Sequence, residues 1–241
     1  MQTTVTANPD RIYSLESVSD DIQLCFVFLP ELLKRYLPDV APADFRKRTR
    51  VRFDEEISLS KFFSAEEIRT VNRFKVIKKQ LEWLGGRLAV KHLAGRQFQK
   101  AAAEITVAYH EKGAPYLRDF PEFPISISHS KDLAVAALRR NRGGPIGLDV
   151  ERIGDALSEN FRRIAFSDAE RQALVDAPVE QVYLSWTVKE AFLKYIGMGF
   201  HENLKTVEFL RNRIHHKGRP VSDVNRISRI IDDYALTLVY R

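Results

Sequence analysis

Apolar runs alternate with polar stretches along the chain and outline its secondary structure. Short apolar segments bounded by turn residues predict β-strands, and we expect them at Gln23–Pro30, Ile125–Ser128, Leu133–Arg139 and Ile146–Glu151. Two longer segments predict helices: one begins near Phe74 or Lys78 and ends at Leu93, and the other runs from about Val179 to Gly197. Strands and helices therefore mix along the chain, and the expected fold class is α/β (α+β).

Two serine residues mark helix starts in corresponding places. Ser64 lies three residues before Glu67, and Ser167 lies three residues before Glu170, which is the spacing of a capping box. A single shift of 103 residues superposes five pairs: Phe63 on Phe166, Ser64 on Ser167, Glu67 on Glu170, Trp83 on Trp186 and Lys91 on Lys194. Five matches at one offset predict an internal duplication, with two similar α/β halves related by a pseudo-twofold axis.

The predicted halves set the expected domain organisation. We expect a polar N-terminal arm at residues 1–22, a first α/β half at 23–118 and a second α/β half at 119–241, joined through the segment Pro115–Pro124. The active site is expected at the junction of the halves, since ligand pockets often form at such places. One chain then builds a whole site, which favours a monomer.

Composition indicates a soluble globular protein with an anionic partner. The chain is 44% hydrophobic and 29% charged, with a net charge of +6. This charge favours nucleic acid, an acidic protein or a phosphorylated small molecule as partner. The single cysteine, Cys25, excludes an intramolecular disulfide and fits a reducing compartment. With no signal-peptide pattern and no apolar stretch of membrane-spanning length, we expect a cytoplasmic protein that does not bind a membrane.

Two acidic residues lie close together in the segment Gly147-Leu148-Asp149-Val150-Glu151. On a strand, Asp149 and Glu151 share one face, and two carboxylates so close repel each other unless a cation or a proton lies between them. Carboxylate oxygens suit a hard divalent cation such as magnesium. The alternative is a solvent-facing strand edge, where these charges pair with Arg152 or another arginine.

A second charged segment is Trp186-Thr187-Val188-Lys189-Glu190-Ala191-Phe192-Leu193-Lys194. Glu190 and Lys194 lie one helical turn apart on the same face, which is the ordinary spacing of a surface ion pair. The apolar residues around the pair instead predict a buried helix, where charges need a partner, a metal or a function. Because lysine suits phosphate groups, the two segments together favour a magnesium-dependent enzyme acting on a phosphate ester. Lys189 points to another side of the helix and either serves in the site or is solvated.

Two further polar features are compatible with phosphate binding. The segment Ser126-Ile127-Ser128-His129-Ser130 places hydroxyl groups beside an imidazole, although a histidine after a strand is often structural. No Gly-x-Ser-x-Gly sequence accompanies it, so a serine hydrolase is not expected. Arg87 and Lys91 share one helix face, which is either simply solvated or an anion contact. No recognised nucleic-acid-binding motif is present.

Four segments occur in a fixed order along the chain: Gly113-Ala114-Pro115, Ser128-His129-Ser130, Gly147 to Glu151, and Trp186 to Lys194. Together they resemble the signatures of the 4′-phosphopantetheinyl transferases, specifically the surfactin-synthetase-activating type. The helix segment from Glu82 to Arg87 is also similar to that family. Some members of the family carry a lysine where this chain has Ala114, which removes one side-chain phosphate contact from the comparison.

The resemblance implies a reaction and a metal site. A 4′-phosphopantetheine group passes from coenzyme A, the cosubstrate, to a serine of an acidic apo acyl or peptidyl carrier protein, giving holo carrier protein and 3′,5′-ADP. Asp149, Glu151 and Glu190 are implied to bind Mg2+ or Mn2+. Glu190 or a metal-bound water accepts the serine proton, and Lys194 contacts phosphate and stabilises the leaving group.

The resemblance also implies contacts to coenzyme A. Ser128 and His129 are expected to hold the 3′-phosphate with help from Arg87 and Lys91. Lys112, Gly113 and Pro115 are expected near the adenine. The carrier protein and pathway served stay open.

Two rival hypotheses remain. The first is a non-catalytic module that binds coenzyme A or a carrier protein, which the full set of three carboxylates and Lys194 disfavours. The second is a basic nucleic-acid-binding protein, whose binding should be sensitive to salt and indifferent to magnesium and to Asp149→Ala. It gives no reason for the three carboxylates, so nucleic acid is not an expected partner.

Overall fold

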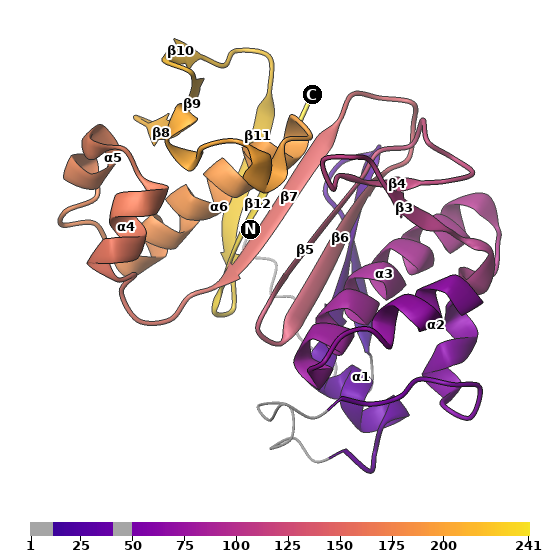
Figure 1. Cartoon of the computed structure of the whole chain (residues 1–241). Helices are drawn as coiled ribbons and strands as arrows, with labels where there is room; N and C mark the ends of the chain where they lie inside the picture. Colours follow the sequence, from indigo (N-terminus) through magenta and orange to yellow (C-terminus); the bar gives the residue numbers. More distant parts are fainter. Residues whose placement is uncertain (1–11, 41–49) are drawn as a thin grey trace. The chain divides into compact units, whose positions relative to one another are not determined.

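The computed structural model describes residues 12–40 and 50–241 (Figure 1). Helices and strands mix along the chain, which confirms the α+β class. The chain forms two compact units. The N-terminal unit contains the described residues 12–40, 50–108 and 116–142, and the C-terminal unit contains 109–115 and 143–241. Within the described ranges, no helix is long and apolar enough to cross a membrane.

The chain divides after Arg142, whereas the sequence predicted a boundary between residues 118 and 119. Strand pairing explains the difference. Strands β5 (Ile125–Ser130) and β6 (Leu133–Arg139) belong to the same sheet as β2 (Ile22–Phe28), and β6 pairs with both β2 and β5. The predicted N-terminal arm also contributes, because β1 (Tyr13–Ser17) pairs antiparallel with β2.

An antiparallel sheet in the order β1-β2-β6-β5 is the frame of the N-terminal unit. All seven residues of β6 are buried, as expected for an apolar strand with a neighbour on each side. Helix α3 (Ile77–Phe98) packs against β2, β5 and β6 (Figure 1). The predicted helix is thus confirmed, and it continues beyond Leu93 to Phe98. The three strands predicted at residues 125–151 are also confirmed.

Shorter elements surround α3. Helix α1 (Leu29–Tyr36) has Pro30 in its first turn, where backbone amides form no helical hydrogen bond and a proline is therefore tolerated. The sequence had predicted that this proline ended a strand. Helix α2 (Ala65–Val71) starts with the predicted capping box at Ser64 and Glu67. Two 3₁₀ turns, η2 (Ser58–Phe62) and η3 (Ala102–Glu104), flank α2 and α3 in sequence. A short hairpin follows, made of β3 (Val107–Tyr109) and β4 (Pro115–Leu117).

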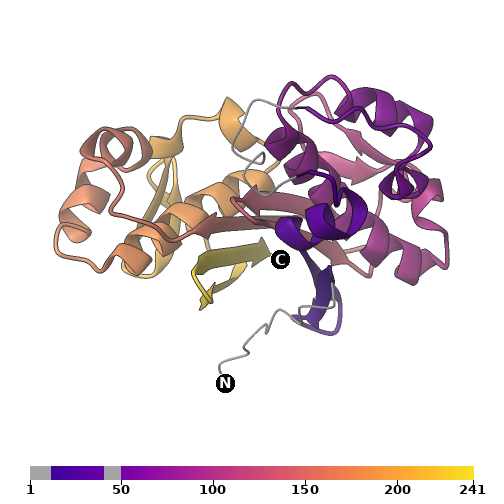
Figure 2. The same ribbon diagram turned by 90° about the horizontal axis from the view of Figure 1, so that it is seen from below.

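The C-terminal unit has its own antiparallel sheet in the order β11-β12-β7. Its strands are β7 (Ile146–Arg152), β11 (Asn225–Ile231) and β12 (Tyr234–Tyr240). Helix α6 (Val179–Tyr195) packs along β7 and β12 (Figure 2) and confirms the second predicted helix. Helices α4 (Glu159–Ala165) and α5 (Asp168–Ala173) precede it, and α5 has the predicted capping box at Ser167 and Glu170.

Residues 199–220, for which the sequence predicted no element, form a small second sheet. It contains β8 (Val207–Leu210), β9 (Arg213–His216) and β10 (Arg219–Pro220), in the order β10-β9-β8. The 3₁₀ turns η4 (Gly199–His201) and η5 (Leu204–Thr206) connect it to α6. Helix α6 contacts β8 as well as the larger sheet, so apolar residues on several sides of α6 are buried.

Gly147 lets β7 and α6 approach each other at backbone distance. A Cβ atom at this position would lie 1.9 Å from the Ala191 carbonyl oxygen and 2.4 Å from the Tyr195 amide nitrogen. Both distances are far below van der Waals contact, so only glycine fits here without moving the strand or the helix.

The two units share an order of elements. In each, the last strand lies between the first long strand and the penultimate strand: β6 between β2 and β5, and β12 between β7 and β11. In each, a long helix follows the first of these strands in sequence and packs on the sheet. The predicted internal duplication agrees with this shared order and stays a prediction.

Candidate active site

Asp149 lies in the middle of β7, in register with Thr237 of β12. The residue is only 4% exposed, so the alternative of a solvent-facing strand edge does not hold for it. Its Oδ1 accepts a hydrogen bond of 2.8 Å from Nζ of Lys194. Glu151, two residues further along the strand, is half-buried. Arg152, the next residue of the strand, donates to Asp233 at 2.6 Å.

Glu190 lies on the part of α6 that packs against β7. The residue is 3% exposed, and its Oε1 is buried with no hydrogen-bond partner in the described part of the chain. Burial raises the pKa of this carboxyl from 4.5 to about 7, and the negative charges of Asp149 and Glu151 add to the rise. Lys194 opposes it. Glu190 is therefore a buried carboxyl poised near neutrality rather than half of a surface ion pair.

Lys194 is the partly exposed member of this group. Its side chain is 24% exposed, and it lies in the last turn of α6, one turn after Glu190. The structure thus brings together Asp149, Glu190 and Lys194 from β7 and α6. Glu151 acts on the Glu190 carboxyl through its charge.

These oxygen donors fit a hard divalent cation by their chemistry. All are carboxylates, the type of donor magnesium takes, and the buried Glu190 Oε1 still lacks a partner. As they stand, no group of three or more His, Cys, Asp or Glu side chains among residues 12–40 and 50–241 has metal-ligand geometry. The ammonium of Lys194 is instead the cation next to Asp149.

Lys189, the neighbour of Glu190, is fully buried. Its Nζ donates to Glu170 Oε2 at 2.5 Å and lies 5.2 Å from the centre of the Phe166 ring. The Glu170 carboxylate also accepts from the backbone amides of Ser167 and Phe209. One ion pair therefore ties α6 to the start of α5 and to β8. The sequence did not decide whether Lys189 serves in the site or is solvated. Its partner is the capping-box residue Glu170, which the sequence had already singled out.

In the N-terminal unit, the Ser-His-Ser segment forms the end of β5. Ser128 and Ser130 are buried, with exposures of 6% and 8%. The His129 side chain is 40% exposed, and its Nδ1 lies 3.9 Å from a carboxylate oxygen of Glu82 on α3. The imidazole of His129 is thus exposed on one face of β5, while the serines on either side of it are buried.

Arg87 of α3 is buried against an aromatic ring. Its guanidinium carbon lies 3.3 Å from the centre of the Trp83 ring, and its Nε lies 3.9 Å from Glu67. Stacking on tryptophan fixes the plane of the guanidinium group and limits its rotamers.

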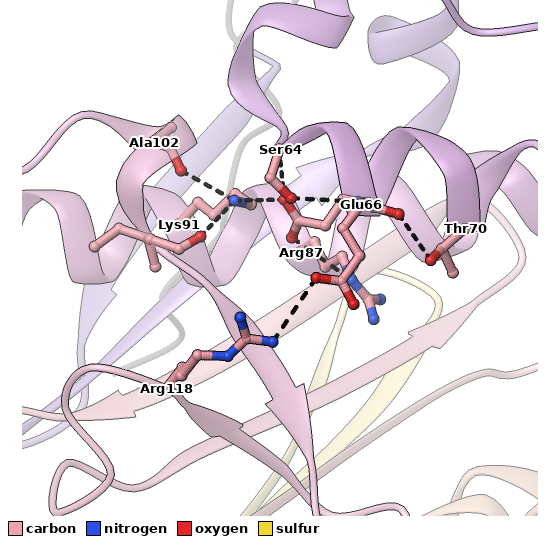
Figure 3. A network of polar contacts seen from close by, with 9 residues as sticks. Ser64, Glu66, Thr70, Arg87, Lys91, Ala102 and Arg118 are labelled. Atoms are coloured by element: carbon pink, nitrogen blue, oxygen red, sulfur yellow. Dashed lines mark hydrogen bonds and ion pairs between the residues drawn. The ribbon is translucent and has the colours of Figure 1, made fainter.

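Lys91 makes its contacts inside the N-terminal unit (Figure 3). Its Nζ donates to the carbonyl oxygens of Ala102 at 3.0 Å and Ile105 at 2.5 Å, and it lies 2.9 Å from Glu67 Oε2. The side chain has no exposed surface. Burial lowers the pKa of this ammonium, and Glu67 counteracts that effect. An ammonium group with three protein partners and no access to solvent stabilises the fold. We therefore do not include Lys91 among the residues that contact coenzyme A.

The remaining predicted residues lie in and next to the turn between β3 and β4. The amide of Gly113 donates to the His110 carbonyl at 2.8 Å, and the amide of His110 donates to the Ala114 carbonyl at 2.9 Å. Gly113 has a φ of +82°, a value that glycine adopts without strain. Lys112 is exposed, with its Nζ 3.1 Å from the sulfur of Met198, and Pro115 is the first residue of β4.

Comparison with known proteins gives the same family. Residues 145–239 match the model of the 4′-phosphopantetheinyl transferase superfamily. The 4′-phosphopantetheinyl transferase ffp of Bacillus subtilis is 30% identical over 173 residues, which cover 69% of this chain and 73% of that protein. The 4′-phosphopantetheinyl transferase psf-1 of Bacillus pumilus is 29% identical over 155 residues, covering 61% of this chain and 64% of psf-1.

A more distant relative comes from a vertebrate. The L-aminoadipate-semialdehyde dehydrogenase-phosphopantetheinyl transferase of Xenopus laevis is 27% identical over 160 residues, covering 60% of this chain and 52% of that protein. The chain therefore spans between about half and three quarters of the length of these relatives. The resemblance inferred from the four sequence segments is confirmed: this chain belongs to the 4′-phosphopantetheinyl transferase superfamily.

Proposed function

We propose that this protein transfers the 4′-phosphopantetheine group of coenzyme A to a serine of an apo carrier protein and releases 3′,5′-ADP. The observation that carries the proposal is the group formed by Asp149, Glu190 and Lys194, in a chain of this superfamily. Two buried carboxyl groups and a lysine on adjoining elements suit a reaction in which negative charge develops on phosphate oxygens.

The reaction exchanges one phosphorus–oxygen bond for another. The serine oxygen of the carrier protein forms a bond to the β-phosphorus of coenzyme A. The bond from that phosphorus to the oxygen bridging to the α-phosphate breaks, and the bridging oxygen leaves with 3′,5′-ADP. The serine proton passes to Glu190 or to a water molecule. Without a bound cation the pKa of the Glu190 carboxyl is about 7, which suits a proton acceptor near neutral pH.

Charge stabilisation is the second requirement. Lys194 lies beside Asp149 with part of its side chain exposed, and it supplies positive charge for the leaving pyrophosphate oxygen. Asp149, Glu151 and Glu190 would hold a magnesium or manganese ion, which when bound neutralises pyrophosphate oxygens. Lys189 does not take part directly, because its ammonium is committed to Glu170.

Coenzyme A is bound by residues outside this group. We assign the 3′-phosphate to Ser128, His129 and Arg87, which offer hydroxyl, imidazole and guanidinium donors. Lys112, Gly113 and Pro115 form the turn assigned to the adenine. The net charge of +6 supports an acidic carrier protein as the second substrate, and the single cysteine supports a reducing, cytoplasmic setting. We infer further that the two units arose by internal duplication and that the enzyme acts as a monomer.

Intact-protein mass spectrometry of an apo carrier protein tests the proposal. After incubation with this protein, coenzyme A and magnesium, the carrier should gain the mass of one phosphopantetheine group. EDTA or Asp149→Ala should abolish the gain. Asp233→Asn is the matched control, because Asp233 pairs with Arg152 at the surface and should leave the gain unchanged.

The alternative function, a non-catalytic module for coenzyme A or carrier protein, makes a different prediction. No mass gain with several acyl and peptidyl carrier proteins, while coenzyme A binds to the folded protein, would favour that module over the transferase. Glu190→Gln separates the two in another way. In a transferase it should abolish transfer while coenzyme A still binds.

A further inference from the structure

A hollow lined by four arginines lies in the N-terminal unit. Its volume is about 470 Å3, and its lining residues are Arg50, Val51, Arg52, Arg69, Asn72 and Arg73. We call it the arginine hollow. None of the residues assigned above to coenzyme A, metal or catalysis lines it. All four arginines are exposed.

Two side-chain amides fix the segment that carries Arg50 and Arg52. Gln80 of α3, which is fully buried, accepts from the Val51 amide at 2.9 Å and donates to the Val51 carbonyl at 2.7 Å. Asn72 does the same for Phe53, with distances of 2.8 and 2.7 Å. Each side-chain amide thus makes the pair of backbone hydrogen bonds that a neighbouring strand would make to that residue. Because both residues are anchored in this way, the arginines beside them are presented by a held backbone.

The other two arginines come from the end of α2. Arg69 lies in its last turn, and Arg73 lies in the turn that follows its end at Val71. The C-terminal end of a helix favours cations, which accounts for a basic residue at Arg69. It does not account for Arg50 and Arg52, which belong to a different segment.

Within the described part of the chain, the charge of the hollow has no neutralising carboxylate. No carboxylate in residues 12–40 and 50–241 forms an ion pair with any of the four arginines, and none lines the hollow. Glu66, the exposed carboxylate of α2, instead faces Arg118 at 3.9 Å (Figure 3). Four like charges around one hollow repel each other, and an anion with several negative groups would relieve that repulsion.

From this arrangement we infer that the arginine hollow docks an acidic segment of the carrier protein. The inference rests on the proposed function, in which the second substrate is taken to be an acidic carrier protein. One phosphate is gripped by one or two guanidinium groups, whereas four on two anchored segments match several carboxylates of a peptide or helix. Nucleic acid is the less fitting partner, because no aromatic side chain lines the hollow to stack on a base.

The double variant Arg69→Glu with Arg73→Glu tests this assignment. At low ionic strength the KM for the carrier protein should rise about tenfold, because rim charges mainly set the association rate. The value of kcat and the KM for coenzyme A should not change. The difference from the unchanged protein should shrink as salt is added. Arg50→Glu with Arg52→Glu should have the same effect, since these arginines line the same hollow.

A control separates docking from general electrostatic attraction. Lys75→Glu with Arg96→Glu makes the same change in net charge at exposed positions of the same unit that do not line the hollow. An equal rise in the carrier KM for this control would overturn the assignment, and so would an unchanged KM in the Arg69 and Arg73 variant. Thermal unfolding should show only small shifts in midpoint for all variants, because every substituted side chain is exposed and Arg69→Glu loses no more than a helix-end cation.

Direct binding keeps the test independent of catalysis. Fluorescence anisotropy with labelled acyl and peptidyl carrier proteins, each with its acceptor serine replaced by alanine, reads docking even if no transfer occurs. Weaker carrier binding by the hollow variants supports the assignment. If the hollow variants lose affinity for a single-stranded oligonucleotide but not for any carrier protein, or if no carrier protein binds to the unchanged protein, the assignment fails. Transfer by the unchanged protein would in either case still uphold the proposed reaction.

Discussion

Helices α3 and α6 occupy corresponding places in the two units but carry different chemistry. The offset of 103 residues that aligns Trp83 with Trp186 also aligns Arg87 with Glu190. In α3 that position is a guanidinium group stacked on tryptophan. In α6 it is a buried carboxyl with an unpartnered oxygen and a raised pKa. The same place in the frame thus supplies positive charge in one unit and negative charge in the other.

The buried lysines of the two helices sharpen the contrast. Each unit has a capping-box glutamate whose carboxylate also pairs with a buried lysine: Glu67 with Lys91, and Glu170 with Lys189. The offset predicts Lys194 as the counterpart of Lys91, but Lys194 is partly exposed and bonds Asp149. The ion pair in α6 comes instead from Lys189, five positions earlier. This shift leaves Lys194 available for chemistry while the structural pair is retained.

The largest expected effect comes from removing either buried lysine. Lys91→Met and Lys189→Met each leave a buried glutamate without its cation, which should lower the free energy of unfolding by about 3–5 kcal/mol. The loss should be greater for Lys91→Met, because the carbonyls of Ala102 and Ile105 also lose a donor. Urea titration followed by circular dichroism measures both.

A second substitution checks that charge is the cause. Adding Glu170→Gln to Lys189→Met should recover part of the lost stability, since the uncompensated carboxylate is gone. If the double variant is less stable than Lys189→Met alone, the backbone amides of Ser167 and Phe209 that bond the two Glu170 oxygens contribute more than the charge.

A smaller effect on the free energy of unfolding should depend on pH and arise from α6 alone, because Glu190 lies on that helix. The pKa of Glu190 is about 7 in the folded protein and near 4.5 when unfolded, so the folded state holds the proton more tightly. As pH rises from 4.5 to 7, the metal-free protein should lose about 3 kcal/mol of unfolding free energy, and no more above that range. Magnesium should reduce the loss, because it stabilises the ionised carboxylate.

Urea titrations in EDTA at pH 5 and pH 8 measure this difference. Glu190→Gln should abolish it, whereas Arg87→Gln should leave it unchanged because an arginine does not titrate in this range. A pH dependence that persists in Glu190→Gln would assign the effect to another group.

The smallest expected effect concerns what the units have in common. Ser64→Ala and Ser167→Ala each remove a side-chain cap from a helix start with the same geometry, and each should cost about 1 kcal/mol. The same titration measures the two losses, which should agree closely. Clearly unequal losses would mean that the two helix starts are held by different contacts despite their shared sequence.

The regular elements followed from local sequence. The long helices, the apolar strands at residues 125–152 and both capping boxes are signals that neighbouring residues carry, so the chain itself predicts them. Pro30 misled, because a proline fits the first turn of a helix as well as the end of a strand. Strands β8 to β12 were not predicted. Strands β8 to β10 are short and separated by turn residues, and β12 pairs with β7, which is remote in sequence.

The sequence predicted which residues belong to the candidate site better than it predicted how they contact one another. Spacing placed Asp149 with Glu151 and Glu190 with Lys194, but only the fold brings Lys194 to Asp149, 45 residues away. Lys91 was misjudged for the same reason. Its partners at Ala102 and Ile105 follow the helix through an irregular segment whose path the sequence does not predict. Likewise, the arginine hollow depends on Gln80 and Asn72, whose partners lie 29 and 19 residues earlier in the sequence.

The close approach at Gly147 has a consequence for inheritance. The glycine is required by the contact between β7 and α6, and this requirement exists whether or not the protein catalyses anything. Asp149 and Glu190 are under no such constraint from packing alone, since a buried carboxyl can be replaced by an amide of the same shape. A descendant that lost activity but kept its fold would therefore keep Gly147 after the acids had changed. In an alignment of such chains, the acids report the reaction and this glycine reports the architecture.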